Sequence, residues 1–199
     1  MVKFLKQKTF VFCFCMVLVS CTSAPYRYDF SLVEPSNETM SFQDSGVKFR
    51  FIPSPERIQV IIKNTTDHDI NLVRERAEYV DSAGKSNRIH YGYNYIQEVR
   101  NFSELYKRSV PPLIIEPDTE IAGFVWLNKW PELSAGYYDR NSIQEYMLSY
   151  LMEPFFPRSS FEGKGEDLKG TAFKLILPID FGGYVARYAF VFRINDVSD

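Results

Sequence analysis

The residue types that carry out most side-chain chemistry are scarce in this 199-residue chain, which has three cysteines and two histidines. A hydrolase triad or a metal site would need a histidine beside suitable partners. His68 stands between Asp67 and Asp69, which could bind a cation, but the polar run around it predicts a hairpin turn whose aspartates bond to local backbone. His90 is expected to pack at a strand end or to contact solvent. We therefore expect no metal site and no cofactor.

Short sequence patterns of known catalysts are also missing. The chain has no Gly-x-Ser-x-Gly elbow, no glycine-rich phosphate loop and no paired-histidine zinc helix. Carboxylate pairs could still support glycoside chemistry, but the sequence does not single out two of its 25 acidic residues. The protein is therefore not expected to be an enzyme.

A tyrosine-rich segment is the candidate binding surface. Tyr91, Tyr93 and Tyr95 alternate with glycine and asparagine, which are residue types that form adaptable contacts in binding loops. Tyr137 and Tyr138 add two aromatic rings further along the chain. The alternative interpretation, which we favour, is that such rings pack in the core of an aromatic-rich domain.

The first 20 residues have the layout of a secretory signal peptide. Three lysines among the first eight residues precede an uncharged apolar run over residues 10–19, and the small residue Ser20 then precedes Cys21. A retained membrane helix is the alternative. A spanning helix needs roughly 20 apolar residues, about twice the length of this run, so a cleaved leader is the better interpretation.

The sequence Leu18-Val19-Ser20-Cys21 resembles the lipobox of bacterial lipoproteins. The resemblance implies that the Cys21 thiol carries a diacylglyceryl group through a thioether, and that signal peptidase II cleaves between Ser20 and Cys21. It also implies acylation of the new amino group, for example with palmitate. Two or more acyl chains hold a protein stably at a membrane, whereas one chain does so only marginally. A plain secreted protein with a free Cys21 thiol is the alternative.

Removal of the leader changes the composition of the mature chain. Cys13 and Cys15 leave with it, so Cys21 becomes the sole cysteine and no internal disulfide can form. The loss of three lysines changes the formal charge from −2 to −5, and no clustered basic face appears, which argues against a nucleic-acid partner. Thr22 follows Cys21, and by the lipoprotein resemblance the absence of aspartate there favours the outer over the inner membrane.

The body of the chain alternates between apolar and polar residues, which predicts strands with one buried and one solvated face. We expect about seven to nine short antiparallel strands, and hence an immunoglobulin-like β-sandwich. Pro178 has no N–H to donate and should lie at an edge or a bulge. The clearest alternating runs are residues 47–51, 57–63, 70–73, 77–80, 88–91, 121–127, 173–179 and 184–194.

We predict a signal peptide over residues 1–20, a lipidated tether over 21–25 and one domain over 26–199. An insertion at about residues 128–168 interrupts the strand pattern. Within it, Asn141 and Gln144 resemble a capping box, and apolar residues at helical spacing predict one helix over about 142–152.

The middle of the chain also resembles a group of uncharacterised bacterial lipoproteins, on residues 58–64, 79–85 and 111–126. This resemblance implies the same sandwich and no known activity. We expect a membrane-anchored, non-catalytic envelope lipoprotein that binds or scaffolds another envelope component. The alternative is an envelope enzyme or small-ligand binder that acts on cell-wall, sugar or lipid molecules through the inserted region.

Overall fold

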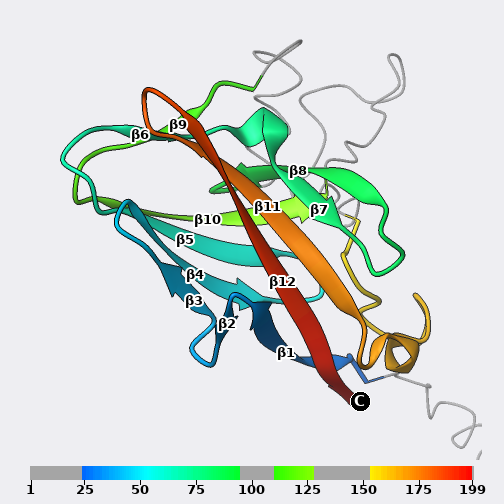
Figure 1. Cartoon of the computed structure of the whole chain (residues 1–199). Helices are drawn as coiled ribbons and strands as arrows, with labels where there is room; N and C mark the ends of the chain where they lie inside the picture. The colour runs from blue at the N-terminus through cyan, green and yellow to red at the C-terminus, as the bar shows by residue number, and fades with distance from the viewer. Residues whose placement is uncertain (1–23, 95–109, 128–152, 199) are drawn as a thin grey trace, which may run out of the picture.

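The computed structural model describes residues 24–94, 110–127 and 153–198, which form mainly antiparallel β structure (Figure 1). The predicted mainly-β, antiparallel fold is confirmed. The strands are β1 (Arg27–Glu34), β2 (Ser36–Asn37), β3 (Ser41–Gln43), β4 (Val47–Pro53), β5 (Ile58–Asn64), β6 (Ile70–Leu72), β7 (Glu78–Val80), β8 (Ser86–Gly92), β9 (Leu113–Ile115), β10 (Glu120–Leu127), β11 (Ala172–Asp180) and β12 (Val185–Ser198). Two short 3₁₀ helices, η1 (Arg74–Arg76) and η2 (Gly165–Leu168), complete the described elements.

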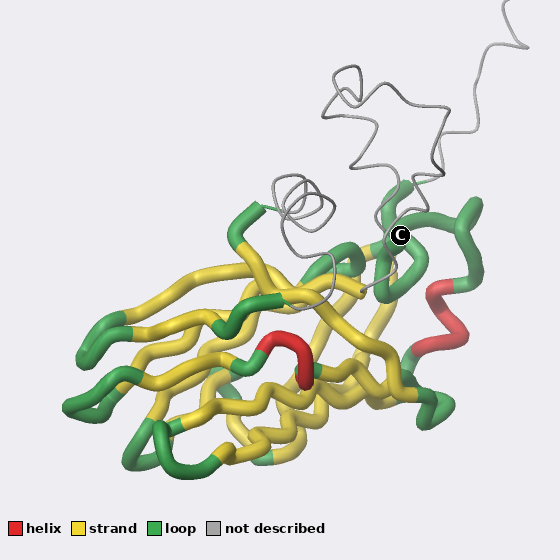
Figure 2. Tube along the Cα trace, turned by 90° about the horizontal axis from the view of Figure 1, so that it is seen from above, coloured by secondary structure: helices red, strands yellow, loops and turns green. Residues whose placement is uncertain are grey.

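The strands form one nearly closed sheet in the order β2-β1-β12-β11-β7-β8-β10-β5-β4-β3, with β6 paired to β11 and β9. β8 joins the two halves because it pairs with β7 on one side and with β10 on the other. β11 and β12 consequently cross in front of β10, β5 and β4 (Figure 1). Seen from above, the loops gather at the two ends of the strands (Figure 2).

Aromatic rings fill the space between the two halves. The Phe190 ring of β12 lies 4.9 Å from the Phe49 ring and 4.6 Å from the Phe51 ring, both on β4. Phe192 lies 5.2 Å from Phe51. Such pairs add a specific edge-to-face attraction to the burial of their apolar area, so these rings hold β12 against β4.

The alternation that predicted these strands is present in their burial. Val47, Phe49 and Phe51 are buried on β4, and the residues between them are exposed. Gly182 has a φ of +82° in the predicted β11–β12 turn, and Asp180 pairs with Val185 across it. Glycine adopts this left-handed conformation without the steric cost that a Cβ brings, so the hairpin prediction is confirmed.

The turn predicted at residues 64–69 does connect two strands, but these strands do not pair with each other. β5 pairs with β4 and β10, whereas β6 pairs with β9 and β11 in the other half of the sheet. The hairpin interpretation is therefore wrong. The buried Asn64 side chain provides the reason, since its amide donates to the carbonyls of His68, at 2.7 Å, and Ile115, at 3.0 Å.

The predicted helix over about residues 142–152 lies outside the described residues. The end of the insertion is described, and it packs on the core through Phe156, which is buried against Tyr28 and Phe173. The Tyr28 hydroxyl also donates to the Pro157 carbonyl at 2.6 Å. Across the described ranges, no helix is long and apolar enough to cross a membrane.

A polar contact ties the loop between β3 and β4 to β12. The Tyr188 hydroxyl donates to Asp44 Oδ2 at 2.7 Å, while the N–H groups of Gly46 and Val47 donate to Asp44 Oδ1 at 2.8 and 2.9 Å. Partial burial alone would raise the pKa of Asp44, but these hydrogen bonds outweigh it and lower the pKa. Burial and the bond to Asp44 raise the pKa of Tyr188.

Asp44 is expected to contribute stability at neutral pH that is lost in acid. Because its pKa is lower in the folded state, the contribution is present above the unfolded pKa of about 4 and disappears as the pH falls through the folded value. Asp44→Asn should lower the free energy of unfolding by about 0.5 kcal/mol at pH 7, because solvent screens the charge of this exposed residue, and it should reduce the decline in stability below pH 4. Urea unfolding of the purified protein at pH 7, 5 and 3 measures this effect. The exposed Asp69→Asn control should follow the wild type, and equal pH slopes for all three proteins would contradict the prediction.

Candidate functional site

Tyr91 does not belong to the predicted binding surface. It is fully buried, its hydroxyl donates to the Val60 carbonyl at 3.2 Å, and its ring lies against Gly123. Burial also raises the pKa of its hydroxyl. The last four residues of β8, Ile89–Gly92, are all buried, so this part of the strand is covered on both faces. Tyr91 is therefore not part of a binding surface, and the favoured interpretation, packing in the core, is the one that applies to this residue.

Tyr93 follows the end of β8, and 53% of its surface is exposed. It is therefore available for contact, as a member of a binding surface must be. Tyr95, Tyr137 and Tyr138 lie outside the described residues. Of the five candidate tyrosines, one is buried and one is exposed, and the other three stay a prediction.

The two histidines occupy different environments. His68 is exposed in the turn after β5, with its Nδ1 3.0 Å from Asp67 Oδ1, and this hydrogen bond lowers the pKa of Asp67. His90 is buried, and its ring lies 5.6 Å from that of Trp126. In the part of the chain that the structure describes, no three His, Cys, Asp or Glu residues are arranged to hold a metal ion.

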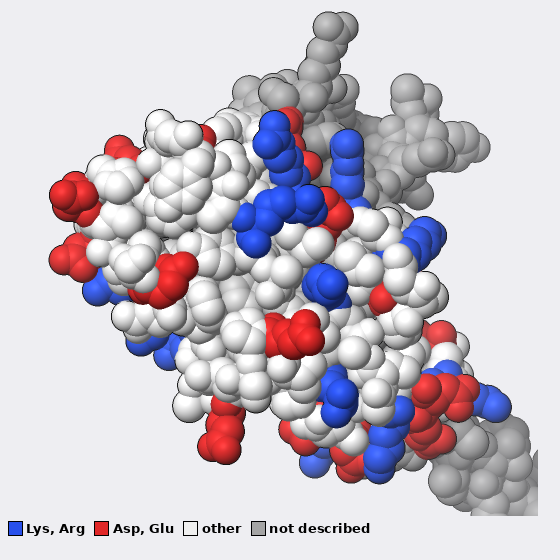
Figure 3. All heavy atoms as spheres, viewed as in Figure 1, with Lys and Arg blue, Asp and Glu red and all other residues white. Residues whose placement is uncertain are grey.

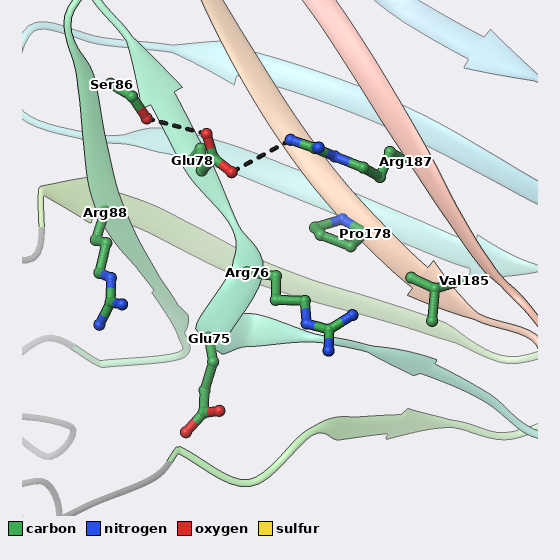
Figure 4. A pocket seen from close by; sticks show the side chains of 8 residues that line it. All are labelled: Glu75, Arg76, Glu78, Ser86, Arg88, Pro178, Val185 and Arg187. Carbon is green, nitrogen blue, oxygen red and sulfur yellow. Dashed lines mark hydrogen bonds and ion pairs between the residues drawn. The ribbon is translucent and has the colours of Figure 1, made fainter.

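A charged groove on the outer face of the sheet is the strongest candidate site. It encloses about 660 Å³ where η1 meets β7, β8, β11 and β12. We call it the arginine groove, and its lining residues are Glu75, Arg76, Glu78, Ser86, Arg88, Pro178, Val185 and Arg187 (Figure 4). Basic and acidic side chains lie close together on this face of the molecule (Figure 3).

Pro178 explains why the sheet is interrupted at this groove. It lies in β11, which is an interior strand rather than an edge, between the residues that pair with β7 and those that pair with β6. A proline cannot donate to a neighbouring strand, so continuous pairing is not available here. The chain instead forms η1 between β6 and β7, and the Val73 N–H donates to the Pro178 carbonyl at 2.9 Å.

The two acids of the arginine groove are held by the protein itself. Glu78 Oε1 accepts a bond from Arg187 at 3.2 Å, and its Oε2 accepts one from the Ser86 hydroxyl at 2.9 Å. Glu75 Oε1 accepts a bond from the Val110 N–H at 2.7 Å. Glu78 therefore holds the Ser86 hydroxyl and the Arg187 guanidinium in place, and the groove presents charged and polar groups to a ligand.

Sequence reasoning did not identify this groove. In the sequence, its arginines and glutamates look like ordinary solvent-exposed residues. Glu78 and Arg187 are also 109 residues apart in the chain, so no local pattern connects them. Pro178 was the available signal, because a proline inside an alternating run marks a place where strand pairing stops.

No protein-family model matches the chain, and a comparison with curated proteins finds no significant match.

Proposed function

We propose that the chain is a membrane-anchored envelope lipoprotein whose β domain binds or scaffolds another envelope component and catalyses no reaction. The lipid sits on Cys21, after cleavage that follows Ser20, and Thr22 favours the outer membrane. We also propose that the nearly closed sheet is a variant of the immunoglobulin-like sandwich, with the predicted helix in its insertion.

An exposed phenylalanine beside the start of the domain carries this proposal. The Tyr26 N–H donates to the Arg158 carbonyl at 2.9 Å, so the loop after Arg158 lies where the tether meets the domain. Phe161 is in this loop, and 78% of its surface is exposed. Transfer of an exposed apolar ring from water to the boundary between lipid headgroups and acyl chains is favourable.

The length of the tether agrees with this orientation. Cys21 is five residues before Tyr26, and an extended chain spans about 3.5 Å per residue, so the domain begins within about 18 Å of the lipid. A domain held this close to the lipid has its Phe161 loop, which lies beside Tyr26, within reach of the bilayer surface. The domain leaves the Phe161 ring exposed, and the membrane would cover it with apolar groups.

Cys21→Ser is expected to abolish anchoring. The wild-type protein should pellet with membranes, and mass spectrometry of its N-terminus should find a lipid adduct on Cys21. The variant should lose the adduct and leave the membrane fraction. Ser23→Ala, two residues from the lipidated position, is the matched control and should behave as the wild type. An unmodified Cys21 in the wild-type protein would refute the anchor.

Crosslinking in intact cells, in the same strains, tests the binding role. A specific partner that is captured by the anchored protein and lost in Cys21→Ser supports scaffolding at the membrane. Turnover of a cell-wall substrate by the purified protein without any captured partner would favour an enzyme instead. The arginine groove supports a second candidate, a small-ligand binder, because its volume lies within the usual range for ligand pockets.

A further inference from the structure

We infer that the arginine groove binds the oxyanion of a small ligand, a carboxylate or a phosphate, through Arg76 and Arg88. This inference builds on the binding role proposed above and names the chemistry of the ligand. It does not depend on the lipid at Cys21.

The positive charges of the groove are less well neutralised than its negative ones. Glu78 is paired with Arg187 and Ser86, and Glu75 accepts the Val110 N–H. Over residues 24–94, 110–127 and 153–198, the guanidinium groups of Arg76 and Arg88 have no hydrogen bond or ion pair. Three guanidinium groups and two carboxylates leave a net positive groove on a chain with a formal charge of −2.

Arginine is well suited to this task because its planar donors match the oxygens of a carboxylate or phosphate in pairs. Arg88 extends from β8, and Arg76 extends from η1 toward Val185 (Figure 4). Glu75 extends away from Glu78 (Figure 4), so the two acids do not form a single negative centre. The two side chains extend in different directions (Figure 4), and both are exposed, so an oxyanion bound by both draws their donors together from two separate elements.

The base of the groove is firmly built. Glu78 and Arg88 are direct partners in the β7–β8 pair, and Pro178 is the partner of Arg187 in the β11–β12 pair. The Glu78–Arg187 bond then links these two pairs across β11. Pro178 and Val185 supply an apolar floor, which suits the uncharged part of a ligand.

The groove lies well away from the end of the domain that carries the tether. Arg187 and Val197 both lie on β12, and Val197 pairs with Tyr28 at that end. Ten residues of strand span about 33 Å, so most of the length of β12 separates the groove from the start of the domain.

An NMR titration of the mature, detergent-extracted protein at constant ionic strength tests the inference. The probes are inorganic phosphate, N-acetyl-alanyl-alanine with its free carboxylate, and the same dipeptide amide as the uncharged comparison. We expect saturable shifts of the amide signals of residues 75–78, 86–88 and 185–187 with one of the two anions and none with the amide. The anion that binds identifies the carboxylate or the phosphate as the natural chemistry.

Variants separate a specific site from general attraction between charges. Arg76→Gln and Arg88→Gln should each weaken binding about tenfold, as expected for the loss of a charge-assisted hydrogen bond. Arg193→Gln is the matched control because Arg193 is exposed on β12 outside the groove, and it should leave the affinity unchanged. Equal weakening by all three substitutions, or no saturable binding of either anion, overturns the inference. Since neither result involves Cys21, failure here is distinct from failure of the anchor.

Discussion

Gly123→Ala is expected to lower the free energy of unfolding by about 3 kcal/mol, at the upper end of the cost of overpacking a core. A Cβ at this position would lie 2.5 Å from Tyr91 Cζ and 2.7 Å from its hydroxyl oxygen. Tyr91 cannot move aside easily, because it is fully buried and its hydroxyl donates to the Val60 carbonyl. The substitution must therefore displace the ring, break its hydrogen bond or separate β10 from β8.

Urea unfolding of the two single variants and the double variant tests this explanation. Tyr91→Leu removes the ring that the new methyl group would meet, so Gly123→Ala should cost much less in that background. Gly183→Ala is the matched control, since nothing lies within 4 Å of its Cβ position. It should change the free energy of unfolding by less than about 0.5 kcal/mol. Additive effects of Gly123→Ala and Tyr91→Leu would show that the two residues are not coupled.

The strands were predictable because their signal is local. On β4 and β12 a buried residue alternates with a more exposed one, and the burial of both strands follows the pattern of their sequence. The composition around Tyr91 left two interpretations open, a binding loop or the core, and the burial of the strand end on both faces decides for the core. Gly123, on the neighbouring strand β10, leaves the room that lets a large ring enter the core.

The route of the chain between strands was less predictable. The polar residues after β5 are typical of a hairpin turn, yet β6 joins the other half of the sheet. The deciding bond runs from Asn64 to Ile115, a separation of 51 residues that no local pattern can encode. Pro178 likewise indicated that strand pairing would be interrupted at its position. It did not indicate which neighbouring strands would be affected.

The two functional predictions differ in the same way. The lipid anchor depends on four consecutive residues, 18–21, so it can be proposed from sequence alone. The arginine groove depends on η1, two hairpins and the bond between Glu78 and Arg187. Each of its charged residues is unremarkable on its own strand, and only the fold brings them together.

Asn64→Leu is expected to lower the free energy of unfolding by about 3 kcal/mol, because it removes the four hydrogen bonds of a fully buried side chain, including the buried bond to the Ile115 carbonyl. Asn64 is fully buried, and its amide nitrogen donates to the carbonyls of His68 and Ile115. Its Oδ1 accepts bonds from both the N–H and the hydroxyl of Thr66. Leucine has a similar volume but can replace none of these bonds, so the cost is chiefly electrostatic.

A second asparagine provides the control for this effect. Asn37 Oδ1 also accepts bonds from the N–H and hydroxyl of a residue two positions later, Thr39, but these groups are exposed to water. Asn37→Leu should therefore cost about 1 kcal/mol or less, since solvent replaces the lost partners. Hydrogen exchange would locate the effect. Asn64→Leu should increase exchange of the amides of β6 and β9 first, because the lost bond to Ile115 joins β5 to that pair. Equal losses of stability in the two variants would contradict the prediction. They would mean that the buried bonds of Asn64 stabilise the fold no more than the exposed bonds of Asn37.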